Sequence, residues 1–152
     1  MLRHTSLIPL SRDHHEGLLL AVRLQQRKKA LLRLWSHDPH WQAKYVVKFF
    51  TDHLAQHFEE EENILFPNIL PFLKKKSEII DRLIKEHTEM RSSIEFFRQP
   101  IESELEEHLT QFGKLLEEHI RTEERELFPL CEEILPANIM NEIGKQISMH
   151  RS

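Results

Sequence analysis

The chain contains little of what β-sheets, tight turns and disulfide frameworks require. Of its 152 residues only three are glycine, one is tyrosine and one is cysteine. Valine and threonine are also scarce, which argues against a sheet. Leucine, glutamate, lysine, arginine and glutamine dominate, and all of them favour helices. The composition therefore predicts an all-α protein, and the length suits a single domain, residues 1–152, with a sizeable core.

Other absences limit the function classes. The lone Cys131 allows no intrachain disulfide and no paired-cysteine metal site, which suits a reducing compartment. The formal charge is −4, and charges of both signs interleave instead of forming the basic stripe that nucleic acid needs. No apolar run has the length of a signal peptide core or a membrane span. We therefore expect a cytoplasmic protein without a nucleic-acid or membrane partner.

Apolar residues recur at helical spacing in four long segments. Their expected bounds are about 10–35, 40–66, 78–98 and 101–128. Asp38-Pro39 and Pro100 are expected breaks, Pro67 and Pro71 bracket the end of the second segment, and Ser77 is a plausible N-cap of the third.

Short connections between the segments predict an antiparallel up-down-up-down four-helix bundle over about residues 8–130. After Pro129, the extension 131–152 should form a short extra helix from Pro136 to about Met149. We expect this helix to cap the bundle or to pack beside it.

The second and fourth segments carry the same motif. Residues 57–67 read His-Phe-Glu-Glu-Glu-Glu-Asn-Ile-Leu-Phe-Pro, and residues 119–129 read His-Ile-Arg-Thr-Glu-Glu-Arg-Glu-Leu-Phe-Pro. The histidine, the two consecutive glutamates and the Leu-Phe-Pro ending coincide. Each motif follows a segment with a candidate histidine. The first and second segments therefore form one helix pair, and the third and fourth segments repeat its arrangement.

The spacing within this motif predicts a buried polar cluster. Residues four apart lie on one helical face, so His57 points the same way as Glu61, and His119 the same way as Glu123. Apolar neighbours in the same phase predict that both pairs face the core. A buried carboxylate without a partner is very unfavourable, and a buried imidazole needs partners for both nitrogens. A metal ion would satisfy both groups.

The first and third segments add one histidine each. His87 has apolar neighbours at helical spacing and should also face inward. On the first segment either His14 or His15 could do so. The pair Asp13-His14 parallels Glu86-His87, and we therefore prefer His14.

The predicted metal ligands are then His14, His57, Glu61, His87, His119 and Glu123. Mixed nitrogen and oxygen ligation with open positions favours non-haem iron. We expect two iron ions, bridged by the carboxylates and by an oxide or hydroxide. About one open position per metal would remain for a small diatomic molecule or an anion, although Glu60 or Glu16 could fill some positions.

The remaining polar residues have ordinary explanations. We interpret Glu59, Glu60 and Glu62 as an exposed helix face. His53 has Leu115 as its counterpart in the fourth segment, which favours a place at the surface. Cys131 is expected to be a small buried residue near the bundle end.

The ordered histidines and both His-x-x-x-Glu pairs, each followed by Leu-Phe-Pro, resemble the hemerythrin/HHE cation-binding domain over roughly residues 8–130. The resemblance implies an antiparallel four-helix bundle with a central di-iron centre. Two departures from respiratory hemerythrins place the chain closer to the bacterial type. Arg91 stands where those proteins have another histidine, and the fourth segment has His-x-x-x-Glu instead of a longer His-to-Asp spacing.

Three classes of function remain open. In the first, the centre binds or senses oxygen, nitric oxide or iron. In the second, it is a di-iron enzyme that removes nitric oxide or peroxide or repairs iron–sulfur clusters. A third alternative is a bundle that signals to a partner protein. No dedicated general acid or base stands out beyond the predicted ligands, which favours binding over catalysis.

Overall fold

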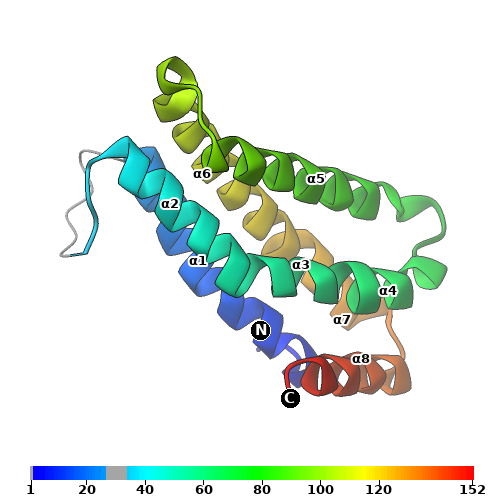
Figure 1. The fold of residues 1–152 in the computed structure, drawn as a ribbon. Helices are drawn as coiled ribbons and strands as arrows, with labels where there is room; N and C mark the ends of the chain where they lie inside the picture. The colour runs from blue at the N-terminus through cyan, green and yellow to red at the C-terminus, as the bar shows by residue number, and fades with distance from the viewer. Residues whose placement is uncertain (1, 27–33) are drawn as a thin grey trace.

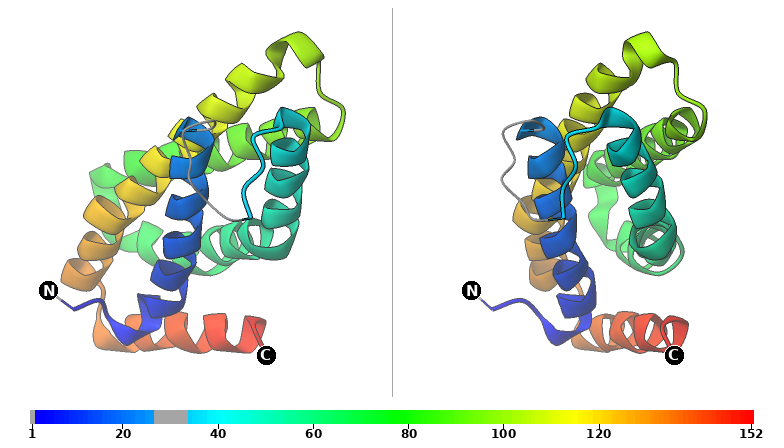
Figure 2. Two further views of the ribbon diagram at one scale, coloured as in Figure 1. Left: turned by 90° about the vertical axis from the view of Figure 1, so that its left-hand side faces the viewer. Right: turned by 60° about the vertical axis from the view of Figure 1, so that its left-hand side comes forward.

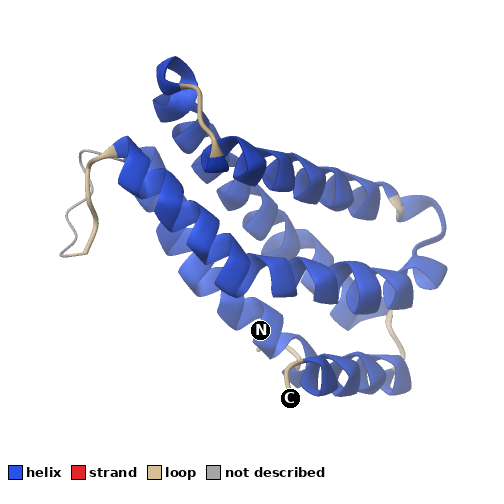
Figure 3. Cartoon of the chain, in the orientation of Figure 1, coloured by secondary structure: helices blue, strands red, loops and turns tan. Residues whose placement is uncertain are grey.

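The computed structural model describes residues 2–26 and 34–152 of the chain. Within these two ranges the regular secondary structure is entirely helical and no strand occurs (Figure 3). The predicted all-α class is therefore confirmed. None of the described helices is both long enough and apolar enough to cross a lipid bilayer.

The first helical stretch consists of a 3₁₀ turn, η1 (Thr5–Leu7), and helix α1 (Ile8–Gln26). The expected end near residue 35 is wrong, because residues 34–38 are not helical; residues 27–33 lie outside the described part of the chain. The break at Asp38-Pro39 is confirmed. The Asp38 side chain caps the next helix by accepting a hydrogen bond from the His40 backbone N–H at 3.3 Å.

The second and fourth stretches each combine α-helical and π-helical segments, and the fourth begins with a 3₁₀ turn. Figure 1 shows α2, α3 and α4 following one another along the second stretch. The second contains α2 (Pro39–Phe49), η3 (Phe50–Leu54), α3 (Ala55–Glu60), η4 (Glu61–Leu65) and α4 (Phe66–Leu73). The fourth contains η6 (Glu102–Glu104), α6 (Leu105–Thr122), η7 (Glu123–Leu127) and α7 (Phe128–Ile134).

Both of these stretches continue beyond the prolines at which we expected them to end. A π turn precedes Pro67 and another precedes Pro129, and in each turn a phenylalanine N–H bonds to the glutamate carbonyl five residues earlier. A new α-helical segment then starts with the proline in its first two positions. A proline is tolerated there because no N–H is needed.

The remaining elements agree with the expected bounds. Helix α5 (Glu78–Arg98) follows the 3₁₀ turn η5 (Lys74–Lys76), and Ser77 precedes it without making a side-chain cap. The extra helix α8 (Ala137–His150) forms as predicted. It crosses one end of the other helices, close to the start of α1 (Figure 2). This corresponds to the capping placement.

The apolar core consists of two clusters. Helix α1 packs along α6, and α5 packs against both α2 and α6. One cluster contains Phe49, Met90 and Phe112, and the other contains Phe66, Leu83 and Phe128. A group of buried histidines and glutamates occurs where each stretch passes from one cluster to the other.

Candidate metal centre

The six predicted ligand residues are all buried, and the structure brings them together. Two overlapping groups are formed, in each of which the candidate ligand atoms lie within 4.8 Å of one another. The first group is His14, His57, Glu61 and Glu123, and the second is Glu61, His87, His119 and Glu123. Both glutamates belong to both groups, so each could bridge two cations.

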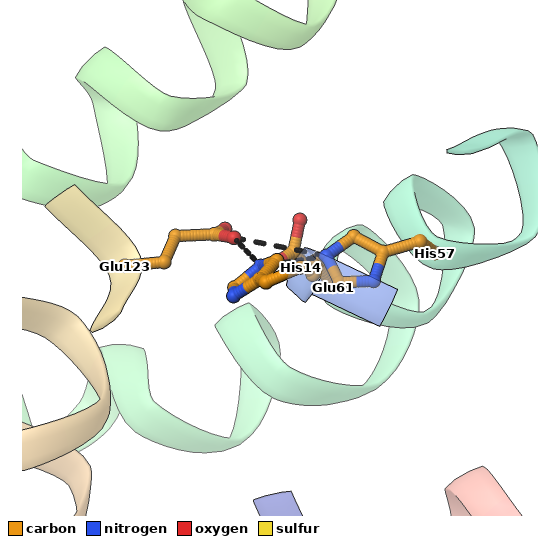
Figure 4. Close-up of side chains that lie close together, drawn as sticks. All are labelled: His14, His57, Glu61 and Glu123. Carbon is orange, nitrogen blue, oxygen red and sulfur yellow. Dashed lines mark hydrogen bonds and ion pairs between the residues drawn. The ribbon is translucent and has the colours of Figure 1, made fainter. Parts of the chain in front are cut away.

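Three helical stretches supply the first group (Figure 4). His14 comes from α1, His57 from α3, and the two glutamates begin the π turns η4 and η7. His14 Nε2 lies 2.8 Å from Glu123 Oε1, and His57 Nε2 lies 3.2 Å from Glu61 Oε2. His15 is exposed, so the preference for His14 agrees with the geometry.

The second group contains a close contact between two imidazoles. His87 Nε2 lies 3.0 Å from Glu61 Oε1 and 3.1 Å from His119 Nε2. His119 Nε2 lies 3.4 Å from Glu123 Oε2. The two rings thus direct the same nitrogen toward a common point between the glutamates.

A carboxylate lies behind each histidine. His57 Nδ1 is 2.9 Å from Asp13, His87 Nδ1 is 2.6 Å from Glu62, and His119 Nδ1 is 2.8 Å from Glu86. Glu124 takes the equivalent place behind His14, with its carboxylate 3.5 Å from Nδ1. The arrangement repeats between the two halves of the chain. His57 and His119 each face an acid from the preceding stretch of their own helix pair. His14 and His87 each face an acid from the second stretch of the other pair.

These carboxylates determine which ring nitrogen faces the cluster. An ionised carboxylate only accepts hydrogen bonds, so the Nδ1 atoms of His57, His87 and His119 must donate. Each neutral ring then presents the lone pair of Nε2 to the interior. Hydrogen-bonded carboxylates behind histidines are the usual support of metal-ligating imidazoles, and they also increase the basicity of the ring.

This donor arrangement fits a cation. Two unprotonated Nε2 lone pairs 3.1 Å apart, on His87 and His119, repel each other unless a proton or a cation lies near both. In addition, three of the buried side-chain atoms without a hydrogen-bond partner among the described residues face the interior of the cluster. They are His57 Nε2, Glu61 Oε2 and Glu123 Oε2. Buried polar atoms normally have partners, and a metal ion would satisfy them.

The electrostatics of the cluster also favour positive charge. Burial disfavours a charged ring, but the charge of Glu61 and hydrogen bonds to Asp13 and Glu123 outweigh it and raise the pKa of His57 well above its usual value. For His119, burial is likewise outweighed, chiefly by the charge of Glu123, and its pKa is also raised well above the usual value. Carboxylates that attract a proton to these rings attract a divalent cation as well.

The acids of the cluster respond in the opposite direction. Burial by itself would raise the pKa of Glu123, but the charge of His119 and its hydrogen bonds lower it well below the usual range. The pKa of Glu61 is lowered too, since the charge on His57 and a hydrogen bond to His119 outweigh burial and the repulsion from Glu123. The two shared glutamates are therefore ionised at neutral pH and available as metal ligands.

Several other residues depart from expectation. Glu60 is buried rather than exposed, and its carboxylate bonds to Arg151 and His150 instead of entering the cluster. Glu62 is half-buried behind His87. Glu16, the other proposed additional ligand, is exposed.

Two further expectations agree with the structure. His53 is exposed and Cys131 is buried. Burial raises the pKa of the Cys131 thiol to about 12, so it is not a reactive thiolate at neutral pH.

The supporting acids Asp13, Glu62, Glu86 and Glu124 were not among the predicted site residues. A signal for them exists in the sequence. Asp13 and Glu86 immediately precede the cluster histidines of α1 and α5, and Glu62 and Glu124 immediately follow the shared glutamates. Their positions repeat between the halves as regularly as those of the ligands.

Comparison with known proteins identifies the family. The model of the hemerythrin HHE cation-binding domain matches residues 6–131. No curated protein and no solved structure matches the chain. The matched range contains all six residues of the cluster and covers most of the chain. The chain therefore belongs to the hemerythrin HHE cation-binding domain family.

Proposed function

We propose that the protein holds a non-haem di-iron centre that binds or senses oxygen, nitric oxide or iron. In this proposal His14 and His57 bind one iron, His87 and His119 bind the other, and Glu61 and Glu123 bridge them. The four helical stretches would form an antiparallel up-down-up-down bundle around the centre within one domain. A cytoplasmic location would suit the lone, buried Cys131.

One observation carries the proposal above all others. The two groups of candidate ligands share both glutamates, which is the arrangement expected for two cations a short distance apart. Four imidazoles and two carboxylates form a nitrogen-rich set, and such a set with open positions favours iron over magnesium or calcium. When bound, a di-iron centre supplies redox chemistry toward small diatomic ligands.

The chain's own residues would bind and orient the metals. The carboxylates behind the histidines hold the rings with Nε2 toward the interior. Two carboxylates offset only half of the charge of two divalent ions, so the centre would favour a small anionic ligand. The apolar clusters on either side, with Phe58 stacked on His87 at a ring-centroid distance of 3.9 Å, limit access of water.

Metal analysis of protein purified without a histidine tag tests this function. We expect about two iron ions per chain and absorption bands that change reversibly when oxygen or nitric oxide is added. Glu126→Gln, an exposed position in the same π turn as Glu123, should leave iron content unchanged. Zinc alone, or protein that takes up no metal when reconstituted with ferrous iron without air, would overturn the proposal.

A further inference from the structure

An arginine pairs with every carboxylate that lies behind a histidine of the cluster. The shortest contacts are Arg151 to Asp13 at 2.6 Å, Arg91 to Glu62 at 2.8 Å, Arg3 to Glu124 at 3.1 Å and Arg82 to Glu86 at 3.3 Å. The cluster thus has three layers, in which histidine, acid and arginine follow one another outward. Each arginine holds its carboxylate in place by an ion pair, and the carboxylate in turn orients the imidazole ring of the histidine.

The four arginines come from different parts of the fold. Arg82 and Arg91 lie on α5, the helix that carries His87, and they support the acids of the His87/His119 group. Arg3 precedes η1 and Arg151 follows α8. These two support the acids of the His14/His57 group, and both lie outside the range 6–131 that the family model matches.

Arg151 is held in place by a second, buried partner. Glu60 is 0 % exposed, and the Arg151 guanidinium contacts its two carboxylate oxygens at 2.6 and 2.9 Å. His150 adds a contact of 3.0 Å to the same carboxylate. A buried ionised glutamate needs such partners. The end of α8 is therefore anchored beside Asp13, which in turn holds His57.

Arg3 is anchored in a similar way. Its guanidinium bridges Glu124 and Glu132, the second at 2.7 Å, and the backbone N–H of His4 also donates to Glu132. The two outer segments contact each other as well. A Cβ on Gly144 of α8 would lie only 2.5 Å from the Ser6 hydroxyl in η1. The segment around Arg3 and helix α8 thus pack as one unit across the end of α1 (Figure 1).

We propose that these outer segments hold one of the two cation positions, that of His14 and His57, in its ligating geometry. Arg151 is the main positioning residue, acting through Asp13 on His57, and Arg3 acts through Glu124 on His14. The arginines that support the acids behind His87 and His119 both lie on α5, so this position is independent of the outer segments. The inference rests on the proposed metal function.

Two backgrounds that retain one position each provide the test. His87→Ala/His119→Ala leaves the His14/His57 position, and His14→Ala/His57→Ala leaves the other. Equilibrium dialysis with ferrous iron under anaerobic conditions measures affinity, and circular dichroism verifies folding. Because loss of a supporting partner typically weakens metal binding about 10–100-fold, Arg151→Gln should weaken binding about tenfold in the first background. In the second it should have no effect. Arg91→Gln is the matched control and should show the reverse pattern.

A double variant separates positioning from stability. Arg151→Gln also removes the arginine partner of the buried Glu60, which by itself destabilises the fold. Glu60→Gln/Arg151→Gln removes the charge that lost this partner, so the melting temperature should recover while binding at the His14/His57 position stays weak. Recovery of binding together with stability would overturn the inference, and so would equal weakening by Arg151→Gln in both backgrounds.

The complete ligand set offers a second measurement if a background fails to fold. The unmodified protein should take up iron in two equivalents, and Arg151→Gln or Arg3→Gln should weaken the same one of them. Two unaltered equivalents in both variants would reject this inference and leave the proposed function standing. An unmodified protein that takes up no metal would reject both.

Discussion

At the scale of single residues, the clearest contrast is between two adjacent histidines. His14 is buried with Nε2 2.8 Å from Glu123, whereas His15 is exposed. His14→Ala should bind about one metal ion per chain fewer than the unmodified protein, because the His14/His57 position loses one of its few ligands. His15→Ala should bind like the unmodified protein. Metal content after dialysis measures both, and a loss with His15→Ala alone would contradict the assignment.

The shared glutamates should be more sensitive than any histidine. Glu123 belongs to both candidate groups, so Glu123→Gln removes a negative ligand from two cations at once. We expect binding of both equivalents to weaken by at least about 100-fold, which corresponds to about 2.7 kcal/mol. Competition with a chelator of known affinity measures this. Glu123→Gln protein that retains one tight equivalent would show that the glutamate does not bridge.

The sequence was sufficient to predict which six residues form the buried cluster, but not every residue around them. The spacing of His57 and Glu61 on one helical face is a local property, and local periodicity shows it. Glu60 lies between them and looks like part of a solvated charge run. Its burial depends on Arg151, 91 positions away, and contacts at that separation leave no periodic signal.

At the scale of elements, the helix ends differ in how well the sequence predicts them. Helix α5 begins after Ser77 and ends before Pro100, and its bounds match the prediction. Pro67 and Pro129 were expected to end helices, but the π turns before them let both helices continue. A π turn changes the phase of the helix without any characteristic residue. Composition therefore gave no indication of it.

The approach of α1 to α6 depends on a glycine. A Cβ on Gly113 would lie 2.8 Å from the Ala21 carbonyl oxygen and 2.8 Å from Leu24 Cβ. The Ala21 carbonyl belongs to the backbone and cannot rotate away from an added methyl group as the tip of a side chain can. Gly113→Ala should therefore lower the free energy of unfolding by about 1–3 kcal/mol. A Cβ on Gly17, on the facing helix α1, would meet only the flexible tip of the Ile120 side chain. Alanine is also more favourable than glycine within a helix, by up to about 1 kcal/mol.

Chemical denaturation of the two alanine variants compares these positions. Gly17→Ala should be more stable than Gly113→Ala by at least about 1 kcal/mol. Equal stabilities would mean that α1 and α6 can separate without cost, and the close packing would then not be what aligns His14 with Glu123.

At the scale of the whole molecule, the cluster separates two apolar cores. In each helical stretch the histidine of the cluster falls between residues of one core and residues of the other, as His87 does between Leu83 and Met90. The polar cluster therefore replaces apolar contacts across the middle of the protein. The protein's stability should consequently depend on how the charges of this cluster are balanced, either by protons or by metal.

The two kinds of balance have opposite dependence on pH. In metal-depleted protein the raised pKa values of His57 and His119 stabilise the fold fully below their unfolded value of about 6.5. This stabilisation is lost as pH rises through the folded values. The lowered pKa of Glu123 contributes above its unfolded value of about 4.3 and is lost as pH falls through the folded value. Metal-depleted protein should therefore be most stable between the unfolded pKa values of about 4.3 and about 6.5, and its free energy of unfolding should fall at higher pH.

Metal binding requires neutral imidazoles, so protons compete with the cation. The melting temperature should rise on addition of ferrous iron, by an amount that is largest above pH 8 and smallest near pH 5, where His14, His57 and His119 hold their protons. Differential scanning calorimetry with and without a chelator at pH 5, 7 and 9 measures this. The variant His14→Ala/His57→Ala/His87→Ala/His119→Ala serves as the control and should lose the effect of iron at every pH. An iron-induced shift of the same size at pH 5 and pH 9 would show that the cation does not replace the protons of His14, His57 and His119.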